Sequence, residues 1–181
     1  MEMLNKDFNL SKFGIQVRLV TEDDAPFIYT LRSDKILTKH IHSFDGTFED
    51  QKEWIRKYKE REVNGEEYYF IYEINHVPFG VNRIYSIKNE EGTTGSWICL
   101  PGTSPIYILA TSIILYDIVF DVIKLNKALY DTRKDNSSAL KVNRALGGEY
   151  LYETDLDFYF ELLPEKYHSV RDKLVRLWHL K

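Results

Sequence analysis

Four side chains in the first half of this chain have the chemistry of a general base, a group that removes a proton from a substrate. Two are His40 and His42 in the segment KHIH, and histidine titrates nearest to neutral pH. Their i, i+2 spacing places both on one side of an extended chain. Glu73 and His76 are alternative bases. A metal pair would need a third ligand, and none accompanies the two histidines, so we predict no metal site.

The segment LPGTSPIY, Leu100–Tyr107, has the position of a phosphate-binding turn, because it joins a strand-like run to a long apolar run. A helix N-terminus offers free N–H groups and the positive end of the helix dipole to an anion. Such turns usually need several glycines, but this one has only Gly102, and Pro105 has no N–H to donate. Thr103 or Ser104 can cap the helix. A phosphate-binding turn and a plain helix start both remain open.

Composition and charge exclude several classes of protein. Hydrophobic residues make up 44% of the 181 residues, which is typical of a folded domain. The net charge is −4 and no run of Lys and Arg forms a basic face, which argues against nucleic acid as a partner. Cys99 is the single cysteine and cannot form an internal disulfide. The first residues lack the apolar segment of a signal peptide, so we expect a cytoplasmic protein.

One stretch, Pro105–Ile123, is about long enough to cross a bilayer. It contains Asp117 and Asp121, and each carboxylate would cost roughly 2.5–3.5 kcal/mol near the membrane centre. We therefore expect the buried helix of a soluble protein and no membrane partner.

Periodicity predicts strands and helices along the whole chain. Gly14–Val20 alternates apolar and polar residues as a strand does, and Thr21 can cap a helix with three acidic residues in its first turn. The helix over Phe48–Arg61 has Thr47 as its cap. The other predicted elements are strands Tyr68–Ile74, Pro78–Ile87, Thr93–Leu100 and Lys127–Thr132, helices from Pro105 and over Ser137–Leu146, a hairpin over Glu149–Leu163 and a tail helix over Glu165–Leu180.

The order of these elements is β-α-α-β-β-β-α-β-α-β-β followed by the tail helix. It predicts a single α/β domain over residues 1–181 with a mixed central sheet, antiparallel at first and parallel around the long helix. The tail helix and the apolar hairpin could bury the face of a homodimer.

The segment after the long helix carries a family resemblance. In FDVIKLNKALYDTRKDNSSALKVNRALGG, Asn136 and Ala139 fill an N-x-x-[SA] pattern, and Gly147 falls where the following helix ends. With the element order, this segment resembles the GNAT superfamily of acyl-CoA-dependent N-acetyltransferases. The front half, LRSDKI and TFEDQKEWI, resembles the branch that acetylates protein N-termini and nucleotide-linked amino sugars.

The resemblance implies that acetyl-CoA is the co-substrate. Two neighbouring parallel strands, here residues 97–100 and 128–132, would splay apart and hold the pantetheine arm between them. Backbone N–H groups near the splayed strand would polarise the thioester carbonyl while an amine attacks it. The acceptor would be a small amine, an amino sugar or a peptide N-terminus. The implied cofactor-binding residues are Trp97, Ile98, Cys99, Leu100, Gly102, Thr103, Ser104, Asn136 and Asn143.

This chain departs from the family pattern in two places. Counted back from Phe120, the two glycines of the family's pyrophosphate turn fall on Ser104 and Ile106. The tyrosine that often protonates the leaving thiolate is replaced by Asn143. Tyr130 or Tyr107 could substitute, or the thiolate could leave unassisted because thiols are fairly acidic.

The resemblance places the acceptor beside the loop that contains the two histidines. We predict His40 and Glu73 as candidate bases and Tyr130 as the candidate acid. Predicted acceptor-binding residues are Arg32, His42, Tyr69 and Arg83. The two departures leave an alternative open, a catalytically inactive GNAT-fold module that serves binding or assembly.

Overall fold

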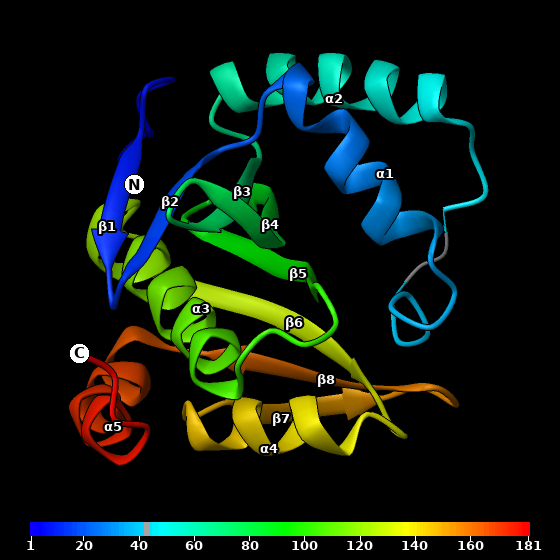
Figure 1. Ribbon diagram of the computed structural model, residues 1–181. Coiled ribbons are helices and arrows are strands. Elements are labelled where there is room, and N and C mark those ends of the chain that lie inside the picture. Colours follow the sequence, from blue (N-terminus) through cyan, green and yellow to red (C-terminus); the bar gives the residue numbers. More distant parts are fainter. Residues whose placement is uncertain (42–43) are drawn as a thin grey trace.

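The computed structural model describes residues 1–41 and 44–181, and these form an eight-stranded sheet between two layers of helices (Figure 1). The strands are β1 Asn9–Lys12, β2 Ile15–Leu19, β3 Tyr68–Ile74, β4 Val77–Lys88, β5 Glu91–Cys99, β6 Lys127–Arg133, β7 Glu149–Glu153 and β8 Asp157–Leu162. The helices are α1 Ala25–Ser33, α2 Phe48–Val63, α3 Pro105–Asp117, α4 Ser137–Ala145 and α5 Pro164–Leu177. A 3₁₀ turn, Glu22–Asp24, leads into α1, and a π-helical segment, Ile118–Val122, extends α3.

The sheet has the strand order β1-β2-β3-β4-β5-β6-β8-β7. All neighbouring strands are antiparallel except β5 and β6, which are parallel. The predicted mixed α/β sheet with one parallel step is therefore confirmed. The parallel ladder covers only Glu91–Thr93 against residues 127–129, and beyond it the two strands diverge (Figure 1).

The two faces of the sheet carry separate hydrophobic cores. Helices α1 and α2 cover one face, where Ile28 and Ile55 pack against Tyr69 and Ile98. Helices α3, α4 and α5 lie against the other face, where α3 supplies a nearly continuous run of buried residues. Alternation along β3 and β5 directs neighbouring side chains into different cores, as a strand buried on both faces requires.

Most predicted boundaries agree with the structure to within two residues, and the differences have simple causes. Strand β1 was not predicted, because four mostly exposed residues give too short a pattern. Thr21 caps the 3₁₀ turn rather than α1 itself. The turn before β5 consists of Asn89 and Glu90 alone, both with positive φ, so β5 begins two residues earlier than predicted.

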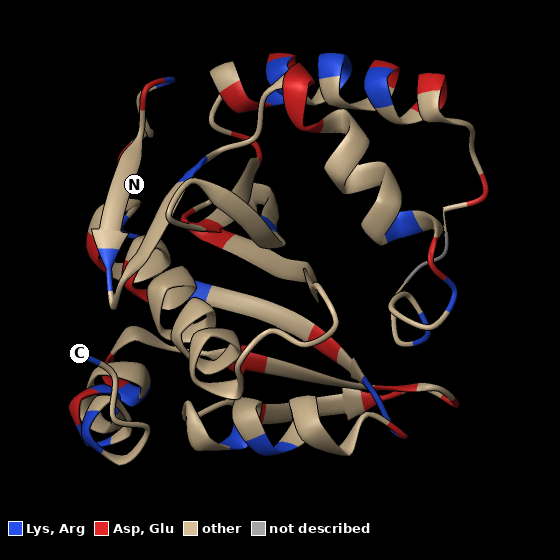
Figure 2. Cartoon of the chain, viewed as in Figure 1, with Lys and Arg blue, Asp and Glu red and all other residues tan. Residues whose placement is uncertain are grey.

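The apolar helix α3 and its π-helical extension form the centre of the second core. The stretch Pro105–Val122 is long and apolar enough to cross a membrane, but 61% of it is buried inside the fold. Figure 2 shows charged bands along α2 and almost none along α3. Its one buried carboxylate, Asp117, accepts hydrogen bonds from Lys12 at 2.5 Å, Tyr167 at 2.7 Å and Arg171 at 2.6 Å.

Candidate active site

A central cleft opens where β5 and β6 separate. The parallel pairing ends at Thr93, and Ser96 has a φ of +54°, which marks a bulge in β5. The register with β4 passes from Gly95 to Ile98, so the bulge residues Ser96 and Trp97 lie outside the ladder. Residues of α3, β6 and α4 complete the walls of the cleft. They include Ser112, Tyr130, Thr132, Asn136 and Asn143.

An outer groove continues this cleft between α3 and α4. The cleft and the groove share Trp97, Asn136 and Ala139, and Cys99 lines the groove beside the start of α3. The indole Nε1 of Trp97 donates a hydrogen bond to Thr111 Oγ1 at 2.9 Å, which fixes the ring against α3. The structure thus brings together three of the side chains that the sequence predicted for the cofactor.

Asn136 both caps a helix and faces the cleft. Its Oδ1 accepts a hydrogen bond from the Ala139 backbone N–H at 3.1 Å, which is the capping contact of α4. Asn143 lies near the C-terminal end of α4, and its Nδ2 donates a hydrogen bond to Thr132 Oγ1 at 2.8 Å. Asn143 therefore ties α4 to β6, whereas Asn136 fixes the start of α4 at the cleft.

Two predicted cofactor residues do not point into the cleft. The Ile98 side chain is buried, and that of Leu100 packs against the same core beneath α1 and α2, on the opposite face of the sheet. Strand alternation explains this, because Trp97 and Cys99 face α3 and their neighbours must face away. Ile98 and Leu100 can contribute only backbone groups to a cofactor.

The turn before α3 is open to solvent. Gly102 occupies the left-handed region with a φ of +81°, where a side chain would be strained. Thr103 Oγ1 donates to the Leu100 carbonyl at 2.8 Å, and Ser104 is the N-cap residue without a side-chain capping bond. The N–H groups of the first turn of α3 are therefore not capped by either hydroxyl.

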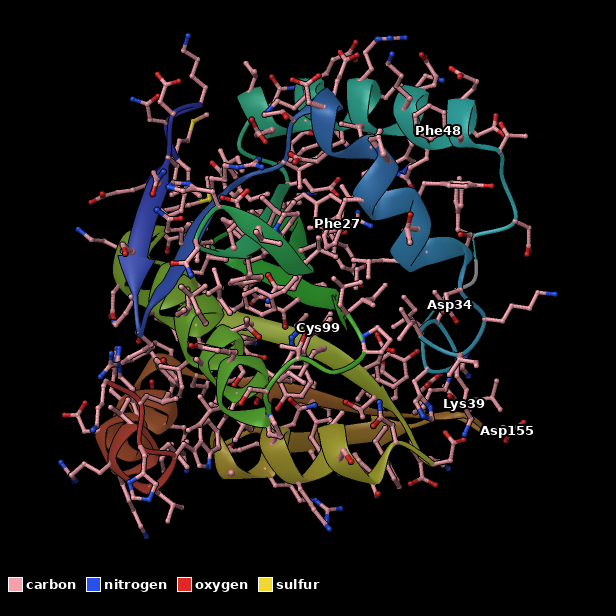
Figure 3. All side chains as sticks on the ribbon, in the orientation of Figure 1. Phe27, Asp34, Lys39, Phe48, Cys99 and Asp155 are labelled. Atoms are coloured by element: carbon pink, nitrogen blue, oxygen red, sulfur yellow. The ribbon has the colours of Figure 1, made fainter. Side chains whose placement is uncertain are left out.

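Cys99 lies partly buried at the end of β5, beside the outer groove (Figure 3). Burial raises the pKa of its thiol to about 12, although a hydrogen bond with Trp97 acts in the other direction. The side chain therefore stays a neutral, unreactive thiol at physiological pH.

The Tyr130 side chain lines the central cleft and also packs in the hydrophobic core beneath α3. Its hydroxyl is buried and has no hydrogen-bond partner among the described residues. Burial raises its pKa well above the ordinary value, so the hydroxyl keeps its proton. A Cβ at position 148 would lie 1.7 Å from the hydroxyl oxygen, which is why glycine occupies that position. Tyr107, the alternative acid, packs on Phe79 instead.

An arginine cavity lies next to the central cleft and shares His40, Gly95 and Ser96 with it. Its other charged walls are Arg32, Arg83, Asp131, Arg133 and Asp157. Arg133 Nη1 donates to Asp157 at 3.4 Å. His40 Nδ1 lies 3.1 Å from the Asp135 carboxylate. The structure therefore places His40 at the cleft, as predicted, whereas His42 lies outside the described residues.

A smaller inner cavity lies beneath α2 and is reached past Arg32 and Arg83, which line both cavities. Tyr69 forms part of its wall, so the three described acceptor-binding residues of the prediction meet here. Burial raises the pKa of Tyr69 to about 12, while the charges of Arg32 and Arg83 partly counter that rise. The remaining walls are Phe44, Gln51 and Trp54.

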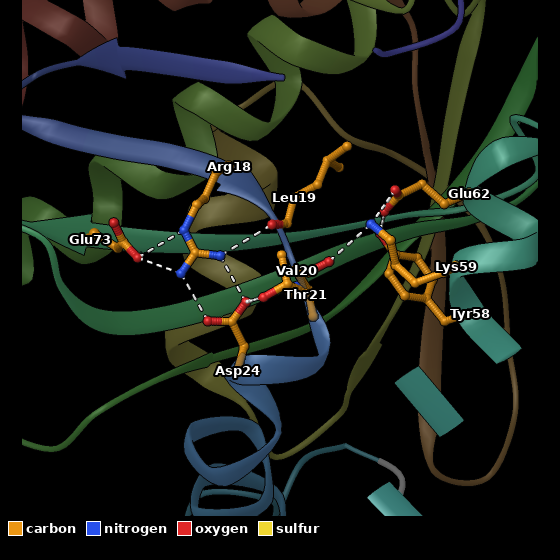
Figure 4. A network of polar contacts seen from close by, with 9 residues as sticks. All are labelled: Arg18, Leu19, Val20, Thr21, Asp24, Tyr58, Lys59, Glu62 and Glu73. Atoms are coloured by element: carbon orange, nitrogen blue, oxygen red, sulfur yellow. Dashed lines mark hydrogen bonds and ion pairs between the residues drawn. The ribbon is translucent and has the colours of Figure 1, made fainter. Parts of the chain in front are cut away.

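The other two candidate bases are not at the cleft. Glu73 accepts hydrogen bonds from Arg18 at 3.0 and 2.7 Å, and Arg18 also donates to Asp24 at 2.7 and 2.8 Å (Figure 4). Glu73 lines none of the cavities described above. His76 has positive φ in the turn between β3 and β4. Both belong to the structure of the sheet rather than to the cleft.

Several residues at the site were not predicted from the sequence, among them Ser96, Arg133 and Gln51. Ser96 follows Gly95 inside a strand, and a glycine there is a known sign of a bulge. Arg133 directly follows the predicted strand Lys127–Thr132 and is the last residue of the observed strand β6. Gln51 carried no signal, because nothing in an amphipathic helix marks one buried amide among several polar residues.

The comparison with protein families gives this chain a family. The profile described as "Acetyltransferase (GNAT) domain" matches residues 15–149. The chain therefore belongs to the GNAT acetyltransferase family. No curated protein matches the sequence.

Solved structures agree with this assignment. FdhC, described as a nucleotide-linked sugar GNAT, is 31% identical over 97% of this chain and 99% of its own, with a TM-score of 0.84. Spermidine N-acetyltransferase from Vibrio cholerae, in complex with CoA and spermine, is 16% identical over 86% of this chain and 98% of its own, with a TM-score of 0.74. Mycobacterium smegmatis RimJ, in complex with CoA-disulfide, is 13% identical over 95% and 93%, with a TM-score of 0.77. The latter two show the shared fold alone.

Proposed function

We propose that this chain transfers an acetyl group from acetyl-CoA to the primary amine of a small acceptor in the cytoplasm. The observation that supports it most is the central cleft, which runs from the bulge at Ser96 to the outer groove beside α3. The identity to a nucleotide-linked sugar GNAT favours an amino sugar as the acceptor.

The cleft offers a group for each step of direct transfer. Bulge N–H groups near Ser96 would stabilise the oxyanion as the amine nitrogen bonds to the thioester carbon. His40, whose Nδ1 lies 3.1 Å from Asp135 without a hydrogen bond between them, would take the amine proton on its other nitrogen. The carbon–sulfur bond then breaks, and the Tyr130 hydroxyl would supply a proton to the leaving thiolate. That hydroxyl has no partner among the described residues, although burial raises its pKa and so makes it a weaker acid.

The alternative is an inactive GNAT-fold binding module. It is favoured by the single glycine of the turn before α3 and by Asn143, whose amide is engaged with Thr132 where many relatives have a tyrosine. Both proposals allow cofactor binding, so only turnover distinguishes the enzyme from the inactive module.

A matched pair of variants tests the cleft. Ala139 on α4 lines both the cleft and the groove, whereas Ala145 on the same helix is exposed. We expect calorimetry to give saturable acetyl-CoA binding that is lost in Ala139→Trp and kept in Ala145→Trp. Thiol release with a panel of amines then measures turnover.

Binding with turnover would support the proposed enzyme. Binding without turnover on any amine or amino sugar would favour the inactive module. Absence of binding at millimolar acetyl-CoA would contradict the use of this cleft for the cofactor.

A further inference from the structure

The central cleft, the arginine cavity and the inner cavity form a series in which each shares walls with the next. The first two share His40 and Ser96, and the last two share Arg32 and Arg83. The two arginines therefore stand between the site proposed for acetyl transfer and the cavity beneath α2. A ligand that filled the series would present one end to Ser96 and pass the arginines in its middle.

The charges of the inner cavity suit an anion, and in the arginine cavity three arginines outnumber the carboxylates of Asp131 and Asp157. The inner cavity is lined by two arginines and, among the described residues, by no carboxylate. Arg83 pairs with Glu67, but Arg61 Nε also donates to Glu67 at 2.7 Å, so one buried carboxylate serves two guanidinium groups. Arg61, Arg83 and Glu67 together keep a net charge of +1. A polyamine would be repelled here, whereas phosphate groups form charge-assisted hydrogen bonds with arginine.

Contacts on several sides keep the Arg83 guanidinium in place before any ligand binds. Its central carbon lies 4.7 Å from the ring centroid of Trp54, 4.9 Å from that of Tyr85 and 5.7 Å from that of Tyr69. Nε donates to Glu67 at 2.7 Å. A group held on several sides binds a ligand at a lower cost in side-chain entropy.

Gln51 gives the inner cavity a polar group that the protein itself does not satisfy. The residue is 2% exposed, and its Oε1 has no hydrogen-bond partner among the described residues. A buried carbonyl oxygen without a donor is costly, and such groups in native proteins require an explanation. A ligand N–H would provide the missing donor, and the walls of Phe44, Trp54 and Tyr69 would surround it with aromatic surface.

We propose that this series binds a pyrimidine nucleoside-diphosphate amino sugar. The amino sugar lies toward Ser96, the diphosphate lies against Arg32 and Arg83, and the ring N–H of uracil or thymine donates to Gln51 Oε1. The inner cavity is smaller than the arginine cavity, which favours a one-ring base over a two-ring base. This assignment rests on the proposed function, because it names the acceptor of that reaction.

The test uses binding rather than turnover. Calorimetry on the full chain would measure UDP, thymidine diphosphate, ADP, inorganic pyrophosphate and spermidine. We expect saturable binding of a pyrimidine diphosphate, at least about tenfold weaker binding of ADP, and no binding of spermidine. Equal binding of ADP, or binding of spermidine instead of the nucleotides, would overturn the assignment.

Three variants locate the parts of the ligand. Gln51→Leu keeps the volume and should weaken binding of the pyrimidine diphosphate about tenfold, the effect of a lost buried hydrogen bond, while pyrophosphate changes less than about twofold. Arg83→Met should weaken both probes by about tenfold or more. Arg61→Met is the matched control, because Arg61 also pairs with Glu67 and lies 5.4 Å from the Trp54 ring but does not line the inner cavity.

The assignment is overturned if Gln51→Leu or Arg83→Met binds like the wild type while remaining folded by circular dichroism, or if Arg61→Met loses as much as Arg83→Met. Acetyl-CoA binding in the same samples separates this proposal from the proposed function. Cofactor binding that is lost in Ala139→Trp, without any nucleotide binding, would overturn the acceptor assignment and leave acetyl transfer standing.

Discussion

Two partly buried arginines, Arg18 and Arg83, lie beneath α1 and α2, and they differ in how completely the protein uses their donors. Arg18 directs all five N–H groups at Asp24, Glu73 and the Leu19 carbonyl (Figure 4). Arg83 pairs with one carboxylate, Glu67, and otherwise faces aromatic rings and two cavities.

The difference separates a structural ion cluster from a binding group. The Arg18 cluster ties β2 to β3 and to the start of α1, and no donor remains for a ligand. Among the described residues, the guanidinium of Arg83 has one carboxylate partner, and it also lines two cavities. A substitution of Arg83 can therefore change ligand binding more than it changes the stability of the fold. Charged residues alone would not distinguish the two.

Removing Arg18 should have the largest effect. Arg18→Met leaves Asp24 and Glu73 buried without their partner, so we expect the free energy of unfolding to fall by about 3 kcal/mol. Urea unfolding measures it. Arg56→Met is the control, since its ion pairs are exposed and should contribute less than about 1 kcal/mol. Equal effects in the two variants would contradict the structural role of Arg18.

The two candidate bases can be compared directly in the catalytic reaction. His40→Gln should lower kcat/KM about 100-fold by removing the base at the cleft, and the acidic limb of its pH profile should disappear. Glu73→Gln should leave kcat/KM within about twofold, because Glu73 is engaged with Arg18. A large fall in kcat/KM for Glu73→Gln, with unchanged stability, would show instead that Glu73 takes part in catalysis.

Acid should weaken the Arg18 cluster by a smaller amount. Burial raises the pKa of Asp24, but hydrogen bonds from Arg18 and Thr21 outweigh it and leave that pKa below its ordinary value. The ion pair therefore stabilises the fold above the pKa of an unfolded aspartate, and this stability is lost as the pH falls through the folded value.

We expect the Asp24 contribution to amount to about 1.5 kcal/mol, the lower end of the range for one hydrogen bond to a charged group. Urea unfolding of the wild type and of Asp24→Asn at pH 7 and pH 3 measures it. The difference between the two proteins should shrink at the lower pH. A difference that grows in acid would show that Asp24 is not held as the carboxylate.

Local patterns in the chain were sufficient for the elements and the family. An aromatic and aliphatic run bounded by turn residues marked β3 at its observed boundaries, Thr47 capped α2 as its spacing indicated, and the Asn136 segment carried the GNAT resemblance that the family profile confirms. These features depend on neighbours within a few residues, so they can be read without the fold.

The site depended on contacts between distant segments. Nothing local distinguished the role of Arg18 from that of Arg83, which both lie in strands, or the role of Glu73 in β3 from that of Glu67 just before it. The bulge at Ser96, the pairing of Glu67 with Arg61 and Arg83, and the unsatisfied amide of Gln51 arise only when α2, β3, β4 and β5 pack together. Periodicity sets which face a side chain takes, but the partner it meets there is decided by packing across the sheet.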